Sequence, residues 1–174
     1  MYKRQPYEFL RNGPVLHELP VRLVGVGGGM DYGTNGVTHH ALEDLALMRV
    51  QPGLAVLAPS DAEQTRAAVL ATRELPGPAY LRLGKGGSAV PGLGGRMRLG
   101  HLELIGDGGD LAIVASGPIA AEAVEAARLL EDEGLAATVA VAASLAPAPV
   151  DDLHALLDSV PLAVTLEALS LIHI

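Results

Sequence analysis

A glycine-rich loop that ends in two histidines is the part of this sequence best suited to chemistry. It follows the apolar run 21–26, contains Gly27-Gly28-Gly29 and ends in Thr38-His39-His40. An imidazole can take up or release a proton near neutral pH, so a histidine here is a candidate for acid–base work on a substrate. A lone histidine at a helix start more often caps or packs, so the surrounding sequence must decide between the two interpretations.

Two basic residues form a second candidate group. Arg82 and Lys85 come at the end of the apolar run 79–83. A cation in this position could bind an anionic group of a substrate, or it could only keep the end of a strand hydrated. Lysine presents a point charge, whereas arginine can fork onto two oxygens of a phosphate, so the two residues would bind an anion differently.

Short apolar strands and helical patterns alternate through the first half of the chain. The sequence predicts strands at 21–26, 54–58 and 79–83, with helices at 40–50 and at about 60–73, the second of which opens on a capping-box pattern. Buried strands in a βαβαβ order favour a parallel sheet. Both candidate groups then lie at the carboxyl edge of that sheet, where open α/β sheets bind ligands.

A glycine-rich stretch separates the first unit from a second one. Residues 84–100 carry several glycines and little hydrophobic periodicity, which is typical of a linker. We therefore expect an α/β fold with two parallel-sheet units, divided into a domain over 1–84, a linker over 85–100 and a domain over 101–174.

The second unit repeats the alternation of strands and helices without repeating the sequence. Three strands and two helices are predicted, namely strands at 111–115, 136–142 and 161–166 and helices at 117–130 and 151–157. Within this unit, Gly106-Asp107-Gly108 precedes a strand and has no asparagine downstream, so turn chemistry explains it better than a magnesium site.

Composition narrows the class of protein. The formal net charge of −8 disfavours nucleic acid as a partner, because phosphate binding needs a basic surface. The absence of cysteine excludes a disulfide framework and cysteine-based metal or nucleophile sites. No apolar run approaches the roughly 20 residues of a membrane span, and the first residues lack a signal-peptide pattern. We expect a cytoplasmic protein that does not associate with membranes.

Several ordered segments resemble the transketolase-like family of thiamine-diphosphate-dependent enzymes. The string Gly36-Val37-Thr38-His39-His40 and the segments 41–49, 52–54 and 58–61 resemble the family's pyrimidine-binding domain, and residues 110–167 resemble the start of its C-terminal domain. The resemblance implies that 1–84 is the C-terminal part of the first domain and that 101–174 is a truncated N-terminal part of the second. The same family includes deoxyxylulose-phosphate synthases and the β subunits of 2-oxoacid dehydrogenases.

The resemblance implies transfer of a two-carbon ketol or acyl unit with thiamine diphosphate and magnesium as cofactors, the thiamine acting as electron sink. Carried over from the family, His39 would be the catalytic residue that hydrogen-bonds the substrate and moves protons. Asn35, Arg82 and Lys85 would join His39 in binding the substrate. Residues that bind the cofactor are not assigned by the resemblance.

Three departures from the family pattern bear on the substrate. Asn35 stands where sugar-phosphate transketolases carry aspartate, and Gly27-Gly28-Gly29 stands where they carry a further histidine. Lys85 takes the place of a phosphate-binding arginine. The set of groups that reads a sugar hydroxyl is therefore incomplete, and a ketose or 2-oxoacid other than the usual pentose phosphates becomes plausible.

The resemblance also implies that this chain is a fragment of the catalytic unit. The family's catalytic glutamate, the aromatics that stack on the pyrimidine and the diphosphate domain would precede the segment where this chain begins. We expect it to be inactive alone and to act in a dimer or with a separate chain that carries the diphosphate domain. Residues 1–5 and 169–174 are expected to be foreign to the family sequence.

A different class of function remains open at this point. The same loop could serve a non-catalytic α/β module that binds a small ligand or a protein partner.

Overall fold

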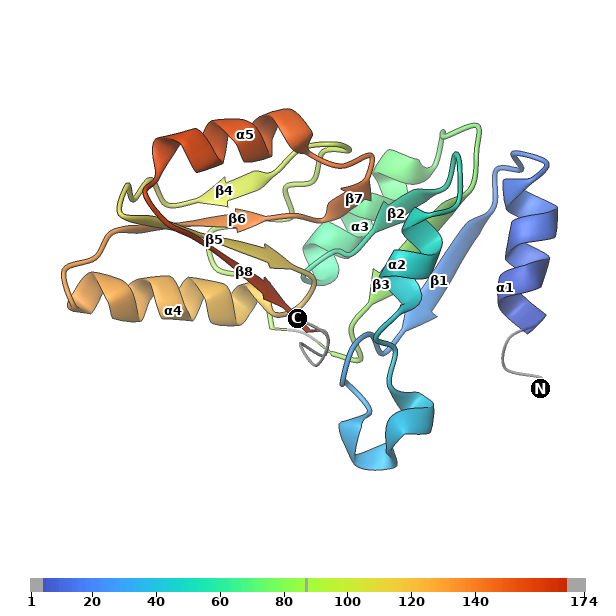
Figure 1. Ribbon diagram of the computed structural model, residues 1–174, viewed down its shortest axis with the longest axis horizontal. Helices are drawn as coiled ribbons and strands as arrows, with labels where there is room; N and C mark the ends of the chain where they lie inside the picture. The colour runs from blue at the N-terminus through green and yellow to red at the C-terminus, as the bar shows by residue number, and fades with distance from the viewer. Residues whose placement is uncertain (1–4, 87, 169–174) are drawn as a thin grey trace.

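The computed structural model describes residues 5–86 and 88–168. Two α/β halves lie side by side, each built on a four-stranded sheet (Figure 1). Most of the predicted foreign ends, namely 1–4 and 169–174, lie outside the described residues. No helix within the described ranges is long and apolar enough to cross a membrane.

The first sheet has the strand order β1-β3-β2-β7. β1 (Arg22–Val26), β3 (Ala79–Leu83) and β2 (Ala55–Leu57) run parallel to one another. β7 (Ser144–Ala146) comes from the second half of the chain and pairs antiparallel with β2. The three parallel strands end at one edge, which is the edge that the sequence predicts for the site.

α3 (Ala62–Thr72) covers one face of the first sheet. Its predicted cap is confirmed, because Asp61 Oδ1 accepts a hydrogen bond from the Gln64 N–H at 2.8 Å. Gln64 Oε1 reaches back in turn and accepts from the Ser60 N–H, also at 2.8 Å. The fully buried Ala68 then packs against apolar side chains of β2 and β3.

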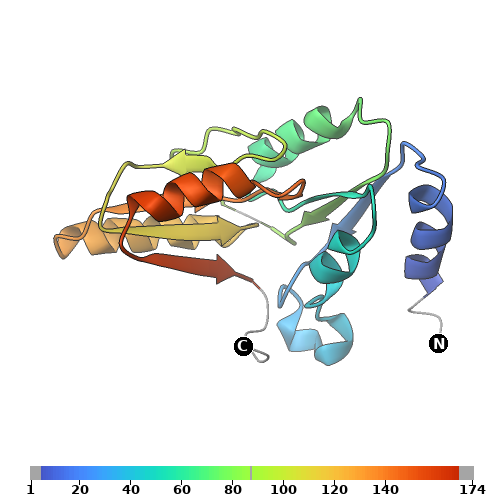
Figure 2. The same ribbon diagram turned by 45° about the horizontal axis from the view of Figure 1, so that its top comes forward.

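Shorter elements cover the opposite face of the first sheet (Figure 2). They are α1 (Gln5–Leu10), the π-helical turn Arg11–Val15 and α2 (Asp44–Arg49). Successive side chains of a strand point to opposite faces, so Val56 packs against these elements while Leu57 packs on the side of α3. Both residues are fully buried, which places a core on each side of the sheet.

The second sheet has the strand order β4-β6-β5-β8. β5 (Leu111–Ser116) lies between β6 (Ala137–Val141) and β8 (Ala163–Glu167) and is parallel to both. β4 (Glu103–Ile105) adds an antiparallel edge beside β6. The predicted α/β fold with two parallel-sheet units is confirmed, with one short antiparallel strand added to each sheet.

Two helices sandwich the second sheet (Figure 1). α4 (Ala120–Asp132) packs on one face with Ile113, and α5 (Val150–Ser159) packs on the other, where its Leu156 meets Ala112. The alternation along β5 therefore fixes which helix covers which face.

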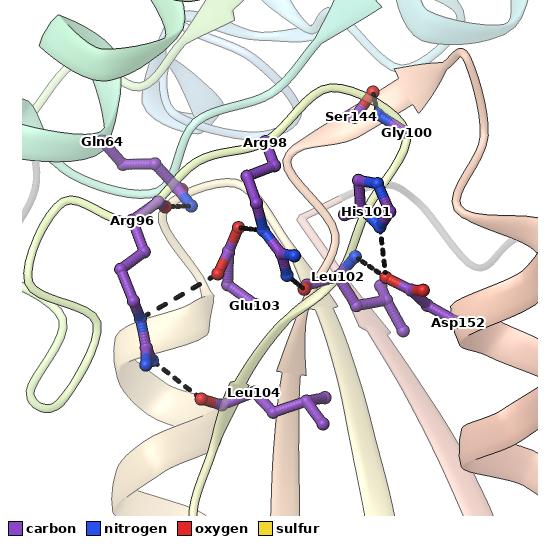
Figure 3. A network of polar contacts seen from close by, with 10 residues as sticks. All are labelled: Gln64, Arg96, Arg98, Gly100, His101, Leu102, Glu103, Leu104, Ser144 and Asp152. Carbon is purple, nitrogen blue, oxygen red and sulfur yellow. Dashed lines mark hydrogen bonds and ion pairs between the residues drawn. The ribbon is translucent and has the colours of Figure 1, made fainter.

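The glycine-rich segment between the halves is fastened on both sides (Figure 3). Gln64 Nε2, from α3, donates to the Arg96 carbonyl at 2.9 Å. The Gly100 N–H donates to the buried Ser144 Oγ on β7, also at 2.9 Å. Leu93 is fully buried in the core of the second half. The stretch expected to act as a linker is thus packed into the junction.

Polar contacts also tie β4 to α5 (Figure 3). The Leu102 N–H donates to Asp152 Oδ2 at 2.9 Å, and His101 Nδ1 lies 3.1 Å from the same oxygen. The backbone hydrogen bond from Leu102 is the main cause that lowers the pKa of Asp152. Beside them, Arg98 Nε donates to the buried Glu103 carboxylate at 3.1 Å.

The start of α2 differs from its sequence prediction. The helix predicted at 40–50 begins only at Asp44. The reason is that Ala41 pairs with Gly29 in an isolated β-bridge, which holds the chain extended before the helix. The prediction that the histidines stand at a helix start is therefore wrong, and His39 instead ends a 3₁₀ turn.

Candidate functional site

The chain between β1 and α2 forms a defined loop at the edge of the first half (Figure 1). We call residues 30–40 the histidine loop. Gly29 and Ala41 form its neck by exchanging two backbone hydrogen bonds, with N···O distances of 2.9 and 3.0 Å. Two 3₁₀ turns, Gly33–Asn35 and Val37–His39, make up its tip.

The two histidines of the loop have different surroundings. His39 is exposed, and its Nδ1 lies 3.0 Å from Thr38 Oγ1. That contact leaves Nε2 as the ring nitrogen available to a substrate. His40 is half-buried, and its Nε2 lies 3.3 Å from the Gly33 carbonyl oxygen, so it braces the loop from within. His39 is therefore the accessible imidazole of the pair.

Asn35 lies on the same loop tip as His39. Its backbone N–H donates to the Tyr32 carbonyl at 2.9 Å, and its side chain is exposed. The turn that ends at Asn35 contacts the turn that ends at His39. An amide and an imidazole thus stand near each other on one exposed surface.

The structure also brings Lys85 to the histidine loop. The Lys85 N–H donates to Asp31 Oδ2 at 2.8 Å. Its ammonium lies 4.7 Å from the centroid of the Tyr32 ring, within the range of a cation–π contact. An exposed positive charge from the end of β3 therefore lies against the loop that carries His39.

Arg82 is directed into the protein. Its side chain is 6% exposed, with Nε 3.5 Å from Asp44 Oδ2 and Nη2 donating to the Ala41 carbonyl at 3.3 Å. Tyr80 donates its hydroxyl to the same Asp44 oxygen at 2.9 Å. Burial raises the pKa of the Tyr80 phenol, and the Asp44 carboxylate adds to the shift, so the phenol remains a donor. Arg82 thus joins β3, α2 and the neck of the loop.

The carboxyl edges of the two sheets meet beside this site. A Cβ built on Gly84, just after β3, would lie 2.5 Å from Pro118, just after β5. A Cβ on Gly29 would lie 1.6 Å from the Ala168 carbonyl oxygen, just after β8. A cavity of about 280 Å³ opens between Gly84, Pro118 and the first turn of α3. The close contacts require glycine at both positions.

Four residues of this arrangement escaped the sequence analysis. Asp31 and Tyr32 lie in the glycine-rich loop itself, so their place beside Lys85 could have been suspected. Asp44 and Tyr80 carry no comparable signal, because neither lies in that loop and their contact joins residues 36 positions apart. No cluster of three or more metal-ligating side chains occurs in the part of the chain that the structure describes.

Comparison with known families covers nearly the whole chain. Residues 4–89 match the transketolase pyrimidine-binding domain, and residues 100–171 match the transketolase C-terminal domain.

Two curated relatives illustrate the match. A subunit of the apulose-4-phosphate transketolase of Phocaeicola vulgatus is 34% identical over 151 residues, which are 84% of this chain and 48% of that protein. A putative transketolase C-terminal section of Methanocaldococcus jannaschii is 29% identical over 144 residues, which are 81% of this chain and 46% of that protein. The chain spans about half the length of these relatives.

Solved structures show the same similarity in three dimensions. A split-gene transketolase superposes with a TM-score of 0.85 at 38% identity, covering 97% of this chain and 54% of that one. The transketolase of Leishmania mexicana superposes with a TM-score of 0.79 at 27% identity, covering 90% of this chain and 24% of that one. The chain belongs to the transketolase family and carries its pyrimidine-binding domain followed by its C-terminal domain.

Proposed function

We propose that this chain is the C-terminal section of a split transketolase, which transfers a two-carbon ketol unit together with a partner polypeptide. The observation that carries the proposal is the exposed His39 on a braced loop at the carboxyl edge of the first sheet. One relative named as a transketolase subunit and another named as a C-terminal section support a division of the enzyme between chains.

His39 is the acid–base group of the proposed reaction. Its Nε2 donates to the carbonyl oxygen of the substrate or accepts a proton from its hydroxyl, while Thr38 holds Nδ1. Asn35 presents an amide that can bind a neighbouring hydroxyl. Lys85 supplies a positive charge for an anionic end of the substrate. Arg82 contributes indirectly, from its buried position against the neck of the loop.

The described residues form one wall of a site and do not by themselves fit thiamine diphosphate. Two of the carboxylates beside the loop are engaged, Asp31 by the Lys85 N–H and Asp44 through one oxygen by Tyr80 and Arg82. The Lys85 ammonium lies over one face of the Tyr32 ring, so that face is already occupied. We propose that the cofactor that transketolases use, with its magnesium ion, is bound mainly by the remainder of the assembled enzyme.

Self-association is the expected state of this chain when its partner is missing. A similar split-gene transketolase is described as an inactive beta4 tetramer. By analogy, we propose that this chain is inactive alone and forms oligomers until the partner polypeptide covers its surface.

Reconstitution tests the proposal. The chain would be coexpressed with a partner that supplies the diphosphate-binding part, and ketol transfer from a panel of ketose phosphates, ketoses and 2-oxoacids would be measured. We expect turnover only with both chains and thiamine diphosphate present. His39→Gln should lower kcat by about 10²–10⁴-fold, the usual contribution of general acid–base catalysis. His154→Gln, at an exposed histidine on α5 away from the loop, is the matched control and should retain most of the activity.

Two results would contradict the proposal. Turnover by the chain alone would remove the need for a partner. Full activity of His39→Gln in the assembled enzyme would remove the role of the loop. A separate outcome, calorimetric binding of a substrate without any turnover, would favour a non-catalytic module instead.

A further inference from the structure

We propose that Arg82 is a positioning residue, which holds the neck of the histidine loop and so sets the place of His39. The inference rests on the proposed function of His39. It differs from a substrate-binding role, because the guanidinium is buried and reaches protein groups in two other segments, Asp44 of α2 and Ala41 of the neck.

The first contact is with the neck of the loop. The Ala41 carbonyl oxygen accepts two hydrogen bonds, one from the Gly29 N–H at 2.9 Å and one from Arg82 Nη2 at 3.3 Å. Ala41 follows His39 by two residues, so a shift of this carbonyl moves the end of the 3₁₀ turn that carries the imidazole. Arg82 therefore acts on His39 through the backbone.

The other end of the guanidinium is anchored in the sheet and in α2. Arg82 Nε lies 3.5 Å from Asp44 Oδ2, and Tyr80 donates to that same oxygen at 2.9 Å. Asp44 is the first residue of α2, and Tyr80 lies on β3 two residues before Arg82. The Asp44 and Tyr80 side chains thus fix the guanidinium, and through it the neck of the loop, relative to the sheet.

Gly28 shows how closely the loop lies on this side chain. A Cβ built on Gly28 would lie 1.9 Å from Arg82 Nε and 2.4 Å from Cζ. Only a residue without a side chain lets the backbone pass directly over the guanidinium. The glycine run of the loop therefore has a steric reason that is tied to Arg82.

The buried pair is poorly arranged for a purely stabilising role. Arg82 Nε and Asp44 Oδ1 are buried and have no hydrogen-bond partner within the described residues. A buried ion pair with such gaps recovers little of its desolvation cost and adds little to stability. Its geometry instead fixes one position of the loop.

Amide hydrogen exchange on the full chain tests the inference without any need for catalysis. In Arg82→Met, the amides of Gly29 and Ala41 should exchange about tenfold faster relative to the Ile113 amide in the other sheet, because one hydrogen bond at the neck is lost. Arg82→Lys keeps the charge but cannot reach both Asp44 and Ala41, so it should give a smaller increase.

Arg22→Met is the matched control. Arg22 is a partly buried arginine at the opposite end of the same sheet, where it donates to the carbonyls of Thr72 and Gly77 at 2.8 and 2.9 Å. Its loss should weaken that end and leave the ratio of neck to Ile113 exchange unchanged. The ¹³C-labelled ring signal of His39 should shift or broaden in Arg82→Met and stay in place in Arg22→Met.

Unchanged neck exchange and an unchanged His39 signal in both Arg82 variants would overturn the inference, and so would equal changes in Arg22→Met. In the assembled enzyme, Arg82→Lys should lower kcat while KM stays within about twofold; a rise in KM alone would indicate direct substrate binding and overturn it as well. A failure of the proposed function would be seen separately, as absent turnover or as full activity of the His39→Gln variant. Neither result would change the hydrogen-exchange result for Arg82.

Discussion

The polar residues around the histidine loop divide by what they already contact. Asp31, Asp44 and Arg82 are engaged with protein groups, whereas His39 presents Nε2 outward and Lys85 presents its ammonium at the surface. A side chain that is held in contacts within the protein is poorly placed to turn toward a ligand, while an exposed donor can exchange water for substrate. We therefore propose that the chemistry of the site depends on His39 and Lys85, while Asp31, Asp44 and Arg82 hold the geometry.

Gly28 offers a prediction at this scale. Gly28→Ala should lower the free energy of unfolding by about 1–3 kcal/mol, because its Cβ would overlap the buried Arg82 side chain. Gly33→Ala, in the adjoining histidine loop, is the matched control, since a Cβ there would meet nothing within 4 Å, and it should change stability by less than about 0.5 kcal/mol. Urea unfolding measures both, and equal values for the two variants would show that Gly28 is not packed against Arg82.

Among the elements, two three-residue strands do much to join the halves. β7 adds to the first sheet although its residues lie between β6 and α5 of the second unit in sequence, and β4 lies at the edge of the second sheet next to the packed segment. The Gly100 N–H bonds to Ser144 on β7, and the Leu102 N–H bonds to Asp152 on α5. Both halves are thereby fastened through backbone donors of the same short segment.

Asp152 makes this junction sensitive to acid. Its pKa is lowered in the folded chain, so its contribution is present above its unfolded pKa, near 4, and is lost as the pH falls toward the folded value. Asp152→Asn should therefore destabilise the chain at pH 5 and have a smaller effect at pH 3. His101 and Arg98 are the charged neighbours that favour the carboxylate.

Urea unfolding of the parent chain and of Asp152→Asn at pH 5 and pH 3 measures how much stability the substitution removes at each pH. Asp151→Asn, on the same helix turn, is the control. An effect of Asp152→Asn that is equal at both pH values would contradict the assignment.

On the scale of the whole molecule, the two sheets bring their carboxyl edges together, and the apolar outer face of β1 is left uncovered. Val24 and Val26 on this edge strand are 55% and 60% exposed. An edge strand with exposed β-branched residues is a surface on which another chain can pair or pack. We expect this surface to contribute to self-association when the partner is missing.

The double variant Val24→Thr, Val26→Thr tests this expectation, since threonine keeps the β-branched shape and lowers the apolar area. Light scattering after size exclusion should show a larger monomer fraction than in the parent chain. Val69→Thr is the control, because Val69 is similarly exposed at 49% but lies on α3. An unchanged oligomer distribution in the double variant would place the association elsewhere.

Local sequence signals predicted the main elements well. The strands near 22–26, 55–57 and 79–83 were expected from short apolar runs, and a cap of α3 was expected from Ser60 or Asp61 with Glu63 or Gln64 three residues on; the structure selects Asp61 and Gln64. These features depend on residues close together in the chain, so the pattern contains the needed information. β4 and β7 were missed because their sequences, Glu-Leu-Ile and Ser-Leu-Ala, are short and each begins with a polar residue, whereas the equally short β2 lies within a longer apolar run.

The start of α2 was mispredicted for a related reason. The spacing of apolar residues after His40 is helical, but Gly29 captures Ala41 in a β-bridge and delays the helix to Asp44. A contact between backbones twelve residues apart thus overrides local propensity.

The sequence by itself determined the α/β class, the transketolase resemblance and the loop in which His39 lies, because each of these depends on residues that are close together in the chain. Only the tertiary structure decided where the Arg82 side chain lies. From the sequence it is one of two cations at the end of a strand; in the fold it is buried between Asp44 and the Ala41 carbonyl, while Lys85 stays exposed beside Tyr32. The physical reason is that burial and charge pairing depend on groups about 40 residues away in the chain, whose approach no local pattern records.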